Sequence, residues 1–313
     1  MFKFLNIKKI IFIIFYSVTI IFLVFPTQYQ VILPGNITSF DEQISITDHE
    51  ISRISSIYVI SYEPITLFQY TIIQTFQNGQ LFIPDASTQA MTMREKYDAA
   101  QLQKLSSYMM SAIVAYTKAE KDITYKFEGF AVTSLFDQER HIQIGDYITS
   151  INDILLNIET DFTQFRNAPI LEFELIRNNE RLEVTHERSE SDLPLSLYPI
   201  YTITQSDPEI SFPGLDSLIG GPSGGMMMTL SIYLSLVKTS YDLNIVGTGT
   251  IQFDGSIGRI GGLNEKYETV KDTMDIMFVP LEQYELLEDI NDDRILPIEH
   301  INDAILYLSE YYG

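Results

Sequence analysis

One serine of this chain, Ser223, stands in the stretch GGPSGG, directly before an apolar run that begins with three methionines. A serine hydroxyl becomes an effective nucleophile only when a neighbouring base takes its proton. The first amides of the helix predicted after this serine could bind the oxyanion that its attack on a carbonyl creates. We expect that site in the flanking backbone, at Gly221, Pro222, Gly224 and Gly225. The same composition also fits a plain helix N-cap or a glycine turn, so the base decides between these interpretations.

Three side chains are candidates for that base. GPSGG formally matches the G-x-S-x-G elbow of Ser–His hydrolases, and His300 lies downstream with acidic neighbours, but no HGGG-type oxyanion motif accompanies it. Lys238 lies about four turns along the helix predicted after the serine, too far to reach back. Lys266 lies just inside the helix predicted after Gly261 and Gly262.

A lysine must lose its proton before it can act as a base. The pKa of a free lysine is near 10.4, and burial can lower it by the roughly 3 units that activity at neutral pH requires. The apolar Ile257, Ile260 and Leu263 near Lys266 favour such burial. Glu265 would oppose it, and we expect this side chain to point outward, because neighbouring helix residues point about 100° apart. We expect Lys271 to be a solvated surface charge.

The blocks GGPSGG, GTGT and GGLNEK place Ser223, Thr248 twenty-five residues later, and Lys266 forty-three residues later. In order and spacing they resemble the proteolytic domain of Lon-type serine proteases, most closely the membrane-anchored, ATPase-free relatives that carry a PDZ domain. The resemblance implies a fold like domain 2 of ribosomal protein S5, a Ser–Lys dyad, and Thr248 as the residue that orients the lysine. Two positions depart from the family pattern: Gly220 replaces an acidic residue of the ATP-dependent members, and Gly224 replaces the usual alanine.

Residues 122–190 predict a separate β-rich module. The string IGDYITSIN at residues 144–152 resembles the G-D-x-I-x-x-I-N signature of PDZ domains. This resemblance implies a groove beside the strand that begins at Phe130, where an extended peptide could add as a further strand. Gly129, Phe130 and Val132 are the predicted peptide-binding residues, with a turn at Gly129 that presents amides to a carboxylate. Alternatively, Phe130 and Val132 are plain core residues.

The N-terminus carries lysines at positions 3, 8 and 9 and then an almost wholly apolar run over residues 10–25. This run is nearly long enough to cross a bilayer as a helix, and we expect it to be a single-pass anchor in the cell membrane. The lysines predict a cytoplasmic N-terminus and an extracytoplasmic remainder. A cleaved signal peptide is the alternative, although no A-x-A-like cleavage site follows.

The expected organisation is a multidomain α+β or α/β chain. Its parts are an anchor at 1–30, a β-rich segment with a helix that supports the protease at 31–121, the PDZ-like module at 122–190 and the protease domain at 195–313. Residues 31–90 predict short strands with a hairpin turn at Asn78–Gly79. Long or buried helices are predicted over residues 93–119, 226–238, 263–274, 281–289 and 301–312, and strands over 244–253 and 276–279.

Composition excludes several classes of partner. A net charge of −22 disfavours nucleic acid. The chain lacks cysteine, has no histidine spacing typical of a metal site and has no P-loop, so we expect no metal, cofactor or nucleotide. The expected partners are a peptide or unfolded protein substrate and the bilayer, and Lon-like domains often form homo-oligomers. The predicted function is a membrane-anchored, extracytoplasmic, ATP-independent serine endopeptidase. The alternatives are an inactive PDZ scaffold and a Ser–His hydrolase that uses His300.

Overall fold

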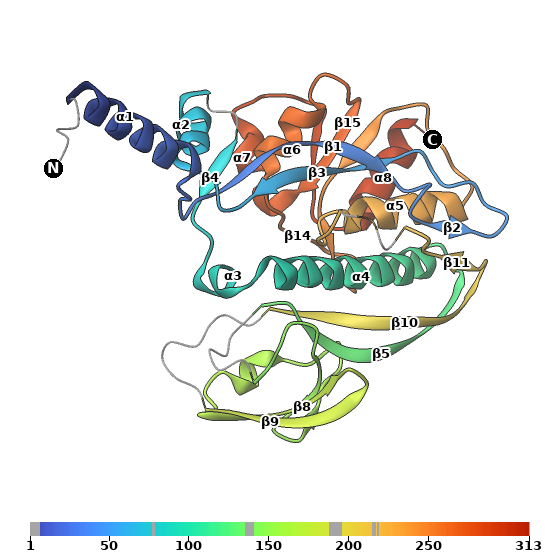
Figure 1. The fold of residues 1–313 in the computed structure, drawn as a ribbon. Coiled ribbons are helices and arrows are strands. Elements are labelled where there is room, and N and C mark those ends of the chain that lie inside the picture. Colours follow the sequence, from blue (N-terminus) through green and yellow to red (C-terminus); the bar gives the residue numbers. More distant parts are fainter. Residues whose placement is uncertain are drawn as a thin grey trace.

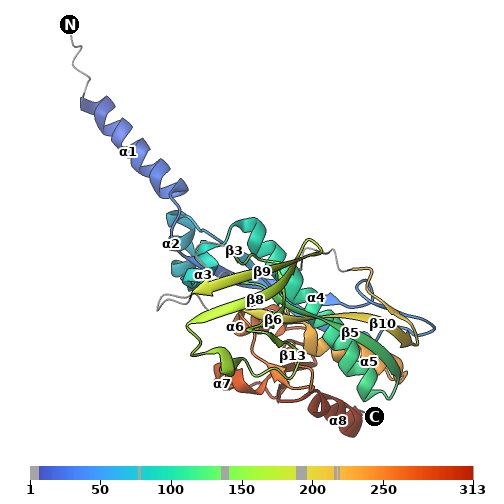
Figure 2. The same cartoon turned by 90° about the horizontal axis from the view of Figure 1, so that it is seen from below.

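The structure is a computed structural model that describes residues 7–76, 79–134, 141–187, 196–214, 217 and 219–312. Helix α1 (Ile7–Val24) projects alone from the body of the molecule, and none of its residues is buried (Figure 2). Among the described residues, one helix, α1, is long and apolar enough to cross a membrane. A signal sequence would meet the same criteria of length and composition. The prediction of an apolar N-terminal helix is confirmed.

The central sheet joins strands from both ends of the sequence. Its order is β16–β15–β12–β3–β1–β4. The strands are β1 (Gln30–Ser39), β3 (Ser55–Tyr62), β4 (Gln80–Phe82), β12 (Ile245–Gly247), β15 (Ile276–Pro280) and β16 (Ile295–Ile298). β3 runs parallel to β12, so the contact between the early and late strands lies in the middle of the sheet. Residues 30–82 therefore form half of the sheet that carries the C-terminal strands.

Helices cover both faces of this sheet, as its alternating side chains require. Ile245 and Phe278 point to one face, where they pack with helices α4 (Met93–Lys118), α5 (Gly225–Leu236) and α8 (Ile301–Tyr312). Val246 and Met277 point to the other, where they pack with α6 (Leu263–Val270) and α7 (Glu285–Glu288). The result is a three-layer α/β unit.

The sequence explains why each of the two helices next to Ser223 forms. α4 starts at a capping box, in which the Thr92 side chain accepts from the Glu95 amide and the Glu95 carboxylate accepts from the Thr92 amide. It then runs for 26 residues without glycine or proline. α5 is apolar on all sides because it is enclosed between α4, the sheet and α8, and Met226, Met227 and Met228 are fully buried.

A second sheet has the order β10–β5–β6–β8–β9, with β7 paired to β6. Its elements are β5 (Asp122–Val132), β6 (Tyr147–Ile151), β7 (Ile154–Leu155), η1 (Phe162–Phe165), β8 (Ile170–Arg177), β9 (Glu180–Glu187) and β10 (Leu197–Asp207). The long pair β5–β10 runs along α4, and β8 and β9 lie beyond it (Figure 1). The module has its own core around Phe130, Ile148 and Phe173.

Among the described residues, β5 is not a free sheet edge at Phe130, which argues against the groove predicted beside it. Phe130 pairs with Pro199 of β10 on one side and with Ile148 of β6 on the other. Gly129 continues the strand at a bulge and forms no turn. Phe130 and Val132 are buried core residues, as the alternative interpretation had it. The outer edge of this sheet is β9, whose charged side chains are typical of an edge that resists further pairing.

Other predictions were confirmed or corrected at the level of elements. The helices predicted at 93–119, 226–238 and 301–312 are α4, α5 and α8. The strand predicted at 244–253 splits into β12 and β13 (Thr250–Ile251), which pairs with β14 (Ile257–Gly258), and the helix predicted at 281–289 consists of η2 (Leu281–Gln283) and α7. Residues 67–76 form helix α2 (Leu67–Phe76) instead of a strand. Asn78 of the predicted hairpin turn lies outside the described residues. The remaining elements are β2 (Ser45–Ile46), α3 (Ala86–Ala90) and β11 (Ile210–Ser211).

Candidate active site

Three loops bring the predicted dyad together. Ser223 precedes α5, Thr248 follows β12, and Lys266 lies in the first turn of α6. The Ser223 carbonyl accepts hydrogen bonds from the Gly249 amide (2.8 Å) and from Thr248 Oγ1 (3.1 Å). These bonds fix the nucleophile loop to the end of a central strand, so the serine is held by backbone geometry.

The lysine amine contacts both hydroxyls. Lys266 Nζ lies 2.9 Å from Ser223 Oγ and 2.7 Å from Thr248 Oγ1. Thr248 is fully buried and Lys266 is 1% exposed, whereas Ser223 is only partly buried. The nucleophile is therefore open to a substrate while its base is enclosed. This is the geometry that proton transfer from serine to lysine requires.

Burial lowers the pKa of Lys266 from 10.5 to about 7. The cause is desolvation, since removal from water penalises the ammonium form. Glu265 does not point outward as predicted: it is 9% exposed, and its carboxylate faces Gly262 at the start of the same helix. Burial raises the pKa of Glu265, so this neighbour is itself pushed toward its neutral form.

The backbone around Ser223 offers two free amides. Gly221 N donates to Ala100 O (2.9 Å) and Gly225 N to Pro222 O (3.1 Å), and proline has no N–H. Of the four predicted oxyanion residues, only Gly224 keeps an available amide. Within the described chain, the amides of Ser223 and Gly224 make no hydrogen bond, and they lie at the positive end of α5. An oxyanion formed beside Ser223 Oγ would find its donors there.

Helix α4 holds the nucleophile loop along one face, and sequence reasoning missed this role. Ala100 O accepts from the Gly221 amide, Ser107 Oγ donates to Pro222 O (3.2 Å), and Ser111 Oγ donates to Gly225 O (3.0 Å). Lys104 Nζ donates to Gly214 O (3.1 Å) from the same face. These positions are separated by four, three and four residues, the spacing of one helix face. Small and polar residues at this spacing are the signal that could have indicated it.

Gly220 and Gly221 make this close approach possible. A Cβ at Gly220 would lie 2.8 Å from Ala100 Cβ, closer than two carbon atoms pack. Gly221 has φ of 86°, in the left-handed region that favours glycine. The glycine at position 220 therefore has a local cause in this chain, which is the close approach of Ala100.

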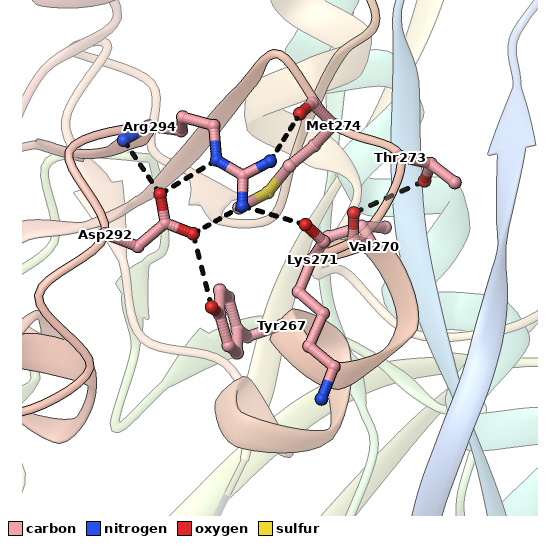
Figure 3. A network of polar contacts seen from close by, with 7 residues as sticks. All are labelled: Tyr267, Val270, Lys271, Thr273, Met274, Asp292 and Arg294. Carbon is pink, nitrogen blue, oxygen red and sulfur yellow. Dashed lines mark hydrogen bonds and ion pairs between the residues drawn. The ribbon is translucent and has the colours of Figure 1, made fainter.

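The far end of α6 is held by an arginine cap (Figure 3). Arg294 donates to the carbonyls of Lys271 (2.8 Å) and Met274 (3.0 Å), which follow the last helical turn. Its guanidinium also makes two hydrogen bonds to Asp292, which accepts a third from the Tyr267 hydroxyl. This network ties the helix that carries Lys266 to the entry of β16.

The competing bases are not near the nucleophile. His300 Nε2 donates to the Asp254 carbonyl (2.9 Å), and its Nδ1 accepts from the Asn302 amide (3.0 Å), so both ring nitrogens are used. Lys238 is exposed beyond the end of α5, opposite to Ser223. Lys271 forms a surface ion pair with Glu268, as predicted.

A small pocket opens beside Ser223. It is lined by α4 residues such as Ser107 and Tyr108, by Ser56 and Tyr58 of β3, and by the nucleophile loop. Its cavity volume is about 40 Å³, which is room for a side chain of only a few atoms.

The comparison with known families agrees with this geometry. Residues 202–305 match the Lon protease (S16) C-terminal proteolytic domain, and the match contains Ser223, Thr248 and Lys266. No curated protein matches the chain. The chain therefore carries a Lon proteolytic domain, which supports a peptidase of the serine type.

Proposed function

We propose that this protein is a membrane-anchored, extracytoplasmic serine endopeptidase with Ser223 as nucleophile and Lys266 as general base. The observation that carries the proposal is the 2.9 Å contact between Lys266 Nζ and Ser223 Oγ, made by a lysine that is 1% exposed. A structural lysine in so apolar a site would need a carboxylate partner, whereas a base needs the neutral amine.

The proposed reaction has two steps. Lys266 takes the proton of Ser223 Oγ as this oxygen attacks the peptide carbonyl, and the amides of Ser223 and Gly224 bind the oxyanion. The lysine then gives its proton to the leaving amine, and an acyl-enzyme remains. Water, deprotonated by the same lysine, attacks the ester, and the acid product leaves with Ser223 restored.

Thr248 acts as a positioning residue in this scheme. Its hydroxyl accepts a hydrogen bond from Lys266 Nζ and donates one to the Ser223 carbonyl. It therefore directs the lysine lone pair toward Ser223 Oγ.

The proposed substrates are extended or unfolded segments of peptides and exported proteins. The chain has no P-loop, so we propose that it works without nucleotide and does not unfold its substrates. The pocket beside Ser223 favours a small side chain next to the scissile bond. Peptide binding by the module at 122–190 stays a prediction, and the paired strand β5 argues against the groove expected there.

Retention of α1 is supported by the segment that follows it. The Leu67 amide donates to Phe25 O (3.1 Å), and the Thr27 amide donates to Ile65 O (2.8 Å). Cleavage directly after Phe25 would remove the first of these bonds, and cleavage after Thr27 would remove both. We therefore favour an anchor over a signal peptide, with the lysines at positions 8 and 9 on the cytoplasmic side.

Cleavage of a casein-type substrate by the full chain in detergent tests the proposal. We expect Ser223→Ala and Lys266→Ala each to reduce kcat by at least about 1000-fold, as is typical when a nucleophile or its base is lost. Lys271→Ala removes a surface lysine from the end of the same helix and should leave kcat unchanged.

Two outcomes would contradict the proposal and would each indicate a different function. Wild-type protein that cleaves nothing between about pH 6 and 9 would indicate a scaffold. Loss of activity in His300→Ala together with activity in Lys266→Ala would indicate a Ser–His hydrolase.

A further inference from the structure

Two stretches of the chain avoid charged residues altogether. Residues 10–40 and residues 64–84 contain no Asp, Glu, Lys or Arg, although 20% of the whole chain is charged. The first stretch contains most of α1 and all of β1, and the second contains α2 and β4. β1 pairs with β4 in the central sheet, so both uncharged stretches meet in space.

Helix α2 lies at the base of α1 (Figures 1 and 2). The Phe22 ring, in the last turn of α1, contacts the Phe68 ring edge-on, with centroids 5.9 Å apart. The hydrogen bonds from Leu67 to Phe25 and from Thr27 to Ile65 hold the two helices at this level. α2 therefore lies where α1 would leave the hydrocarbon of a bilayer.

One face of α2 is buried, and its exposed residues are uncharged, with Phe68 and Phe76 among glutamines and threonines. Ile73 packs on Val31 and Ile65 in a small core. Phe68 is 39% exposed and Phe76 is 72% exposed, and Ile83, just after β4, is 45% exposed. Large apolar side chains that are exposed in a stretch without any charge are typical of a contact site.

We propose that α2 is a second membrane-contacting element that lies in the interface of the same bilayer as α1. The inference rests on the proposed anchoring role of α1. The occupant is lipid, because the surface continues directly from the membrane helix and carries no charge in a protein of net charge −22. An uncharged surface avoids repulsion from anionic headgroups, and apolar side chains that enter the interface stabilise the contact.

This second contact would fix the orientation of the catalytic unit. A domain that is anchored by a single helix through a flexible linker can rotate freely relative to the membrane. Contacts of both α1 and α2 with the bilayer would fix its orientation. β1 enters the central sheet directly from this base, so the sheet and the site at its centre would keep one distance from the lipid surface.

Tryptophan fluorescence can test the contact, because the chain contains no tryptophan. Three full-length variants, Tyr16→Trp in α1, Phe76→Trp in α2 and Tyr311→Trp in α8, each place one fluorophore at a site that is 58–72% exposed. Each is reconstituted into phosphatidylcholine vesicles with either plain or dibrominated acyl chains, since bromine quenches only nearby tryptophan. We expect quenching of at least about twofold for Tyr16→Trp and Phe76→Trp, and none for Tyr311→Trp.

The outcomes separate the two claims. Quenching at position 16 without quenching at position 76 would overturn the role of α2 and leave the anchor intact. No quenching at either position would overturn both the anchor and the role of α2. Equal quenching at positions 76 and 311 would also overturn the inference, because it would indicate unspecific adsorption. Casein cleavage by the same three samples reports separately on the proposed protease.

Discussion

At the scale of single residues, the proposed role of Ser223 as nucleophile depends on the enclosure of Lys266. A lysine whose pKa is about 7 is half neutral at neutral pH, whereas a solvated lysine is almost wholly protonated. Thr248 and Ser223 supply hydroxyl contacts to the amine without supplying a negative charge. The site therefore favours the neutral amine while keeping it oriented.

The first prediction concerns the pH dependence of catalysis. Only the neutral form of Lys266 can take the serine proton, so we expect kcat/KM to rise about tenfold per pH unit below pH 7 and to level off above it. Initial rates on an uncharged peptide between pH 5 and 9 measure this profile. A profile that still climbs about tenfold per unit between pH 8 and 9 would mean that the lysine is not desolvated.

The second prediction concerns stability. The pKa of Lys266 is 10.5 when unfolded and about 7 when folded, so between these values the unfolded state binds one more proton. The free energy of unfolding should then rise with pH by about 1.4 kcal/mol per unit in this window. Lys266→Met, which has no charge to desolvate, should be more stable than wild type by a few kcal/mol at pH 7.

The gain in Lys266→Met should shrink toward zero near pH 10, where the unfolded lysine also loses its proton. Thermal unfolding of the detergent-solubilised full chain, followed by circular dichroism at pH 7 and pH 10, measures both values. Lys271→Met serves as the control and should show no such pH-dependent gain. An equal Tm for Lys266→Met and wild type at pH 7 would contradict the stated burial cost.

At the scale of elements, α4 is the support of the nucleophile loop. The contact between Gly220 and Ala100 is the tightest point of this support. Gly220→Ala should push the loop away from the helix, because its methyl group would lie 2.8 Å from Ala100 Cβ. We expect kcat on a peptide substrate to fall by about tenfold or more, since small displacements of a nucleophile are costly.

A compensating change makes this prediction specific. Ala100→Gly removes the clashing methyl group, so the double variant should recover much of the lost kcat. Ala100→Gly alone should lower stability by about 1 kcal/mol, the usual cost of glycine inside a helix. If the double variant is as slow as Gly220→Ala, the loss does not arise from this contact.

The elements also show where sequence reasoning succeeds. α4, α5 and α8 follow from local pattern, because their apolar residues and caps lie within one segment. The stretch LFQYTIIQTF of α2 looks like a strand, since its β-branched and aromatic residues favour strands. Its packing against α1 and β1 overrides that preference. The pairing of the strand at Phe130 could not be predicted for a similar reason, because its β10 partner lies about 70 residues later.

The chemistry of the candidate site could be predicted from the sequence, but the contacts that hold its residues in place could not. The spacing of Ser223, Thr248 and Lys266 led to the predicted dyad, and the structure places the lysine within hydrogen-bond distance of the other two side chains. The role of α4 depends on a fold in which residues 100–111 touch residues 214–225, and local patterns carry no information on such contacts. The burial of Glu265 likewise depends on β1, which covers α6 from far away in the sequence.

At the scale of the whole molecule, the catalytic unit is discontinuous. The sheet needs β1 and β3 from the first quarter of the chain and β12, β15 and β16 from the last. The family match at residues 202–305 contains only the later strands. The module lies between the two halves and connects to them through β5 and β10.

We therefore expect the rest of the protein to fold when the module is removed. We do not expect the region of the family match, residues 202–305, to fold alone. Phe127 faces Tyr201 across the β5–β10 pair, so an Asn-Gly turn in place of residues 128–200 can close a hairpin. We expect this variant to fold and to cleave a short unstructured peptide with a kcat/KM within about tenfold of wild type, because the cores are separate. Residues 196–313 alone, which lack β3 and α4, should aggregate on expression. A folded but inactive hairpin variant would show that the module contributes to the site itself.

The interleaved sheet also determines when activity can appear during synthesis. A ribosome makes β1, β3 and α4 early, yet β12 must add beside β3, and α6 must follow, before Lys266 is enclosed next to Thr248. Until then the lysine is hydrated and protonated, so the nascent chain is inert. If the proposed protease is assembled in this order, we expect the unfinished chain to be unable to attack other chains that are still being made nearby.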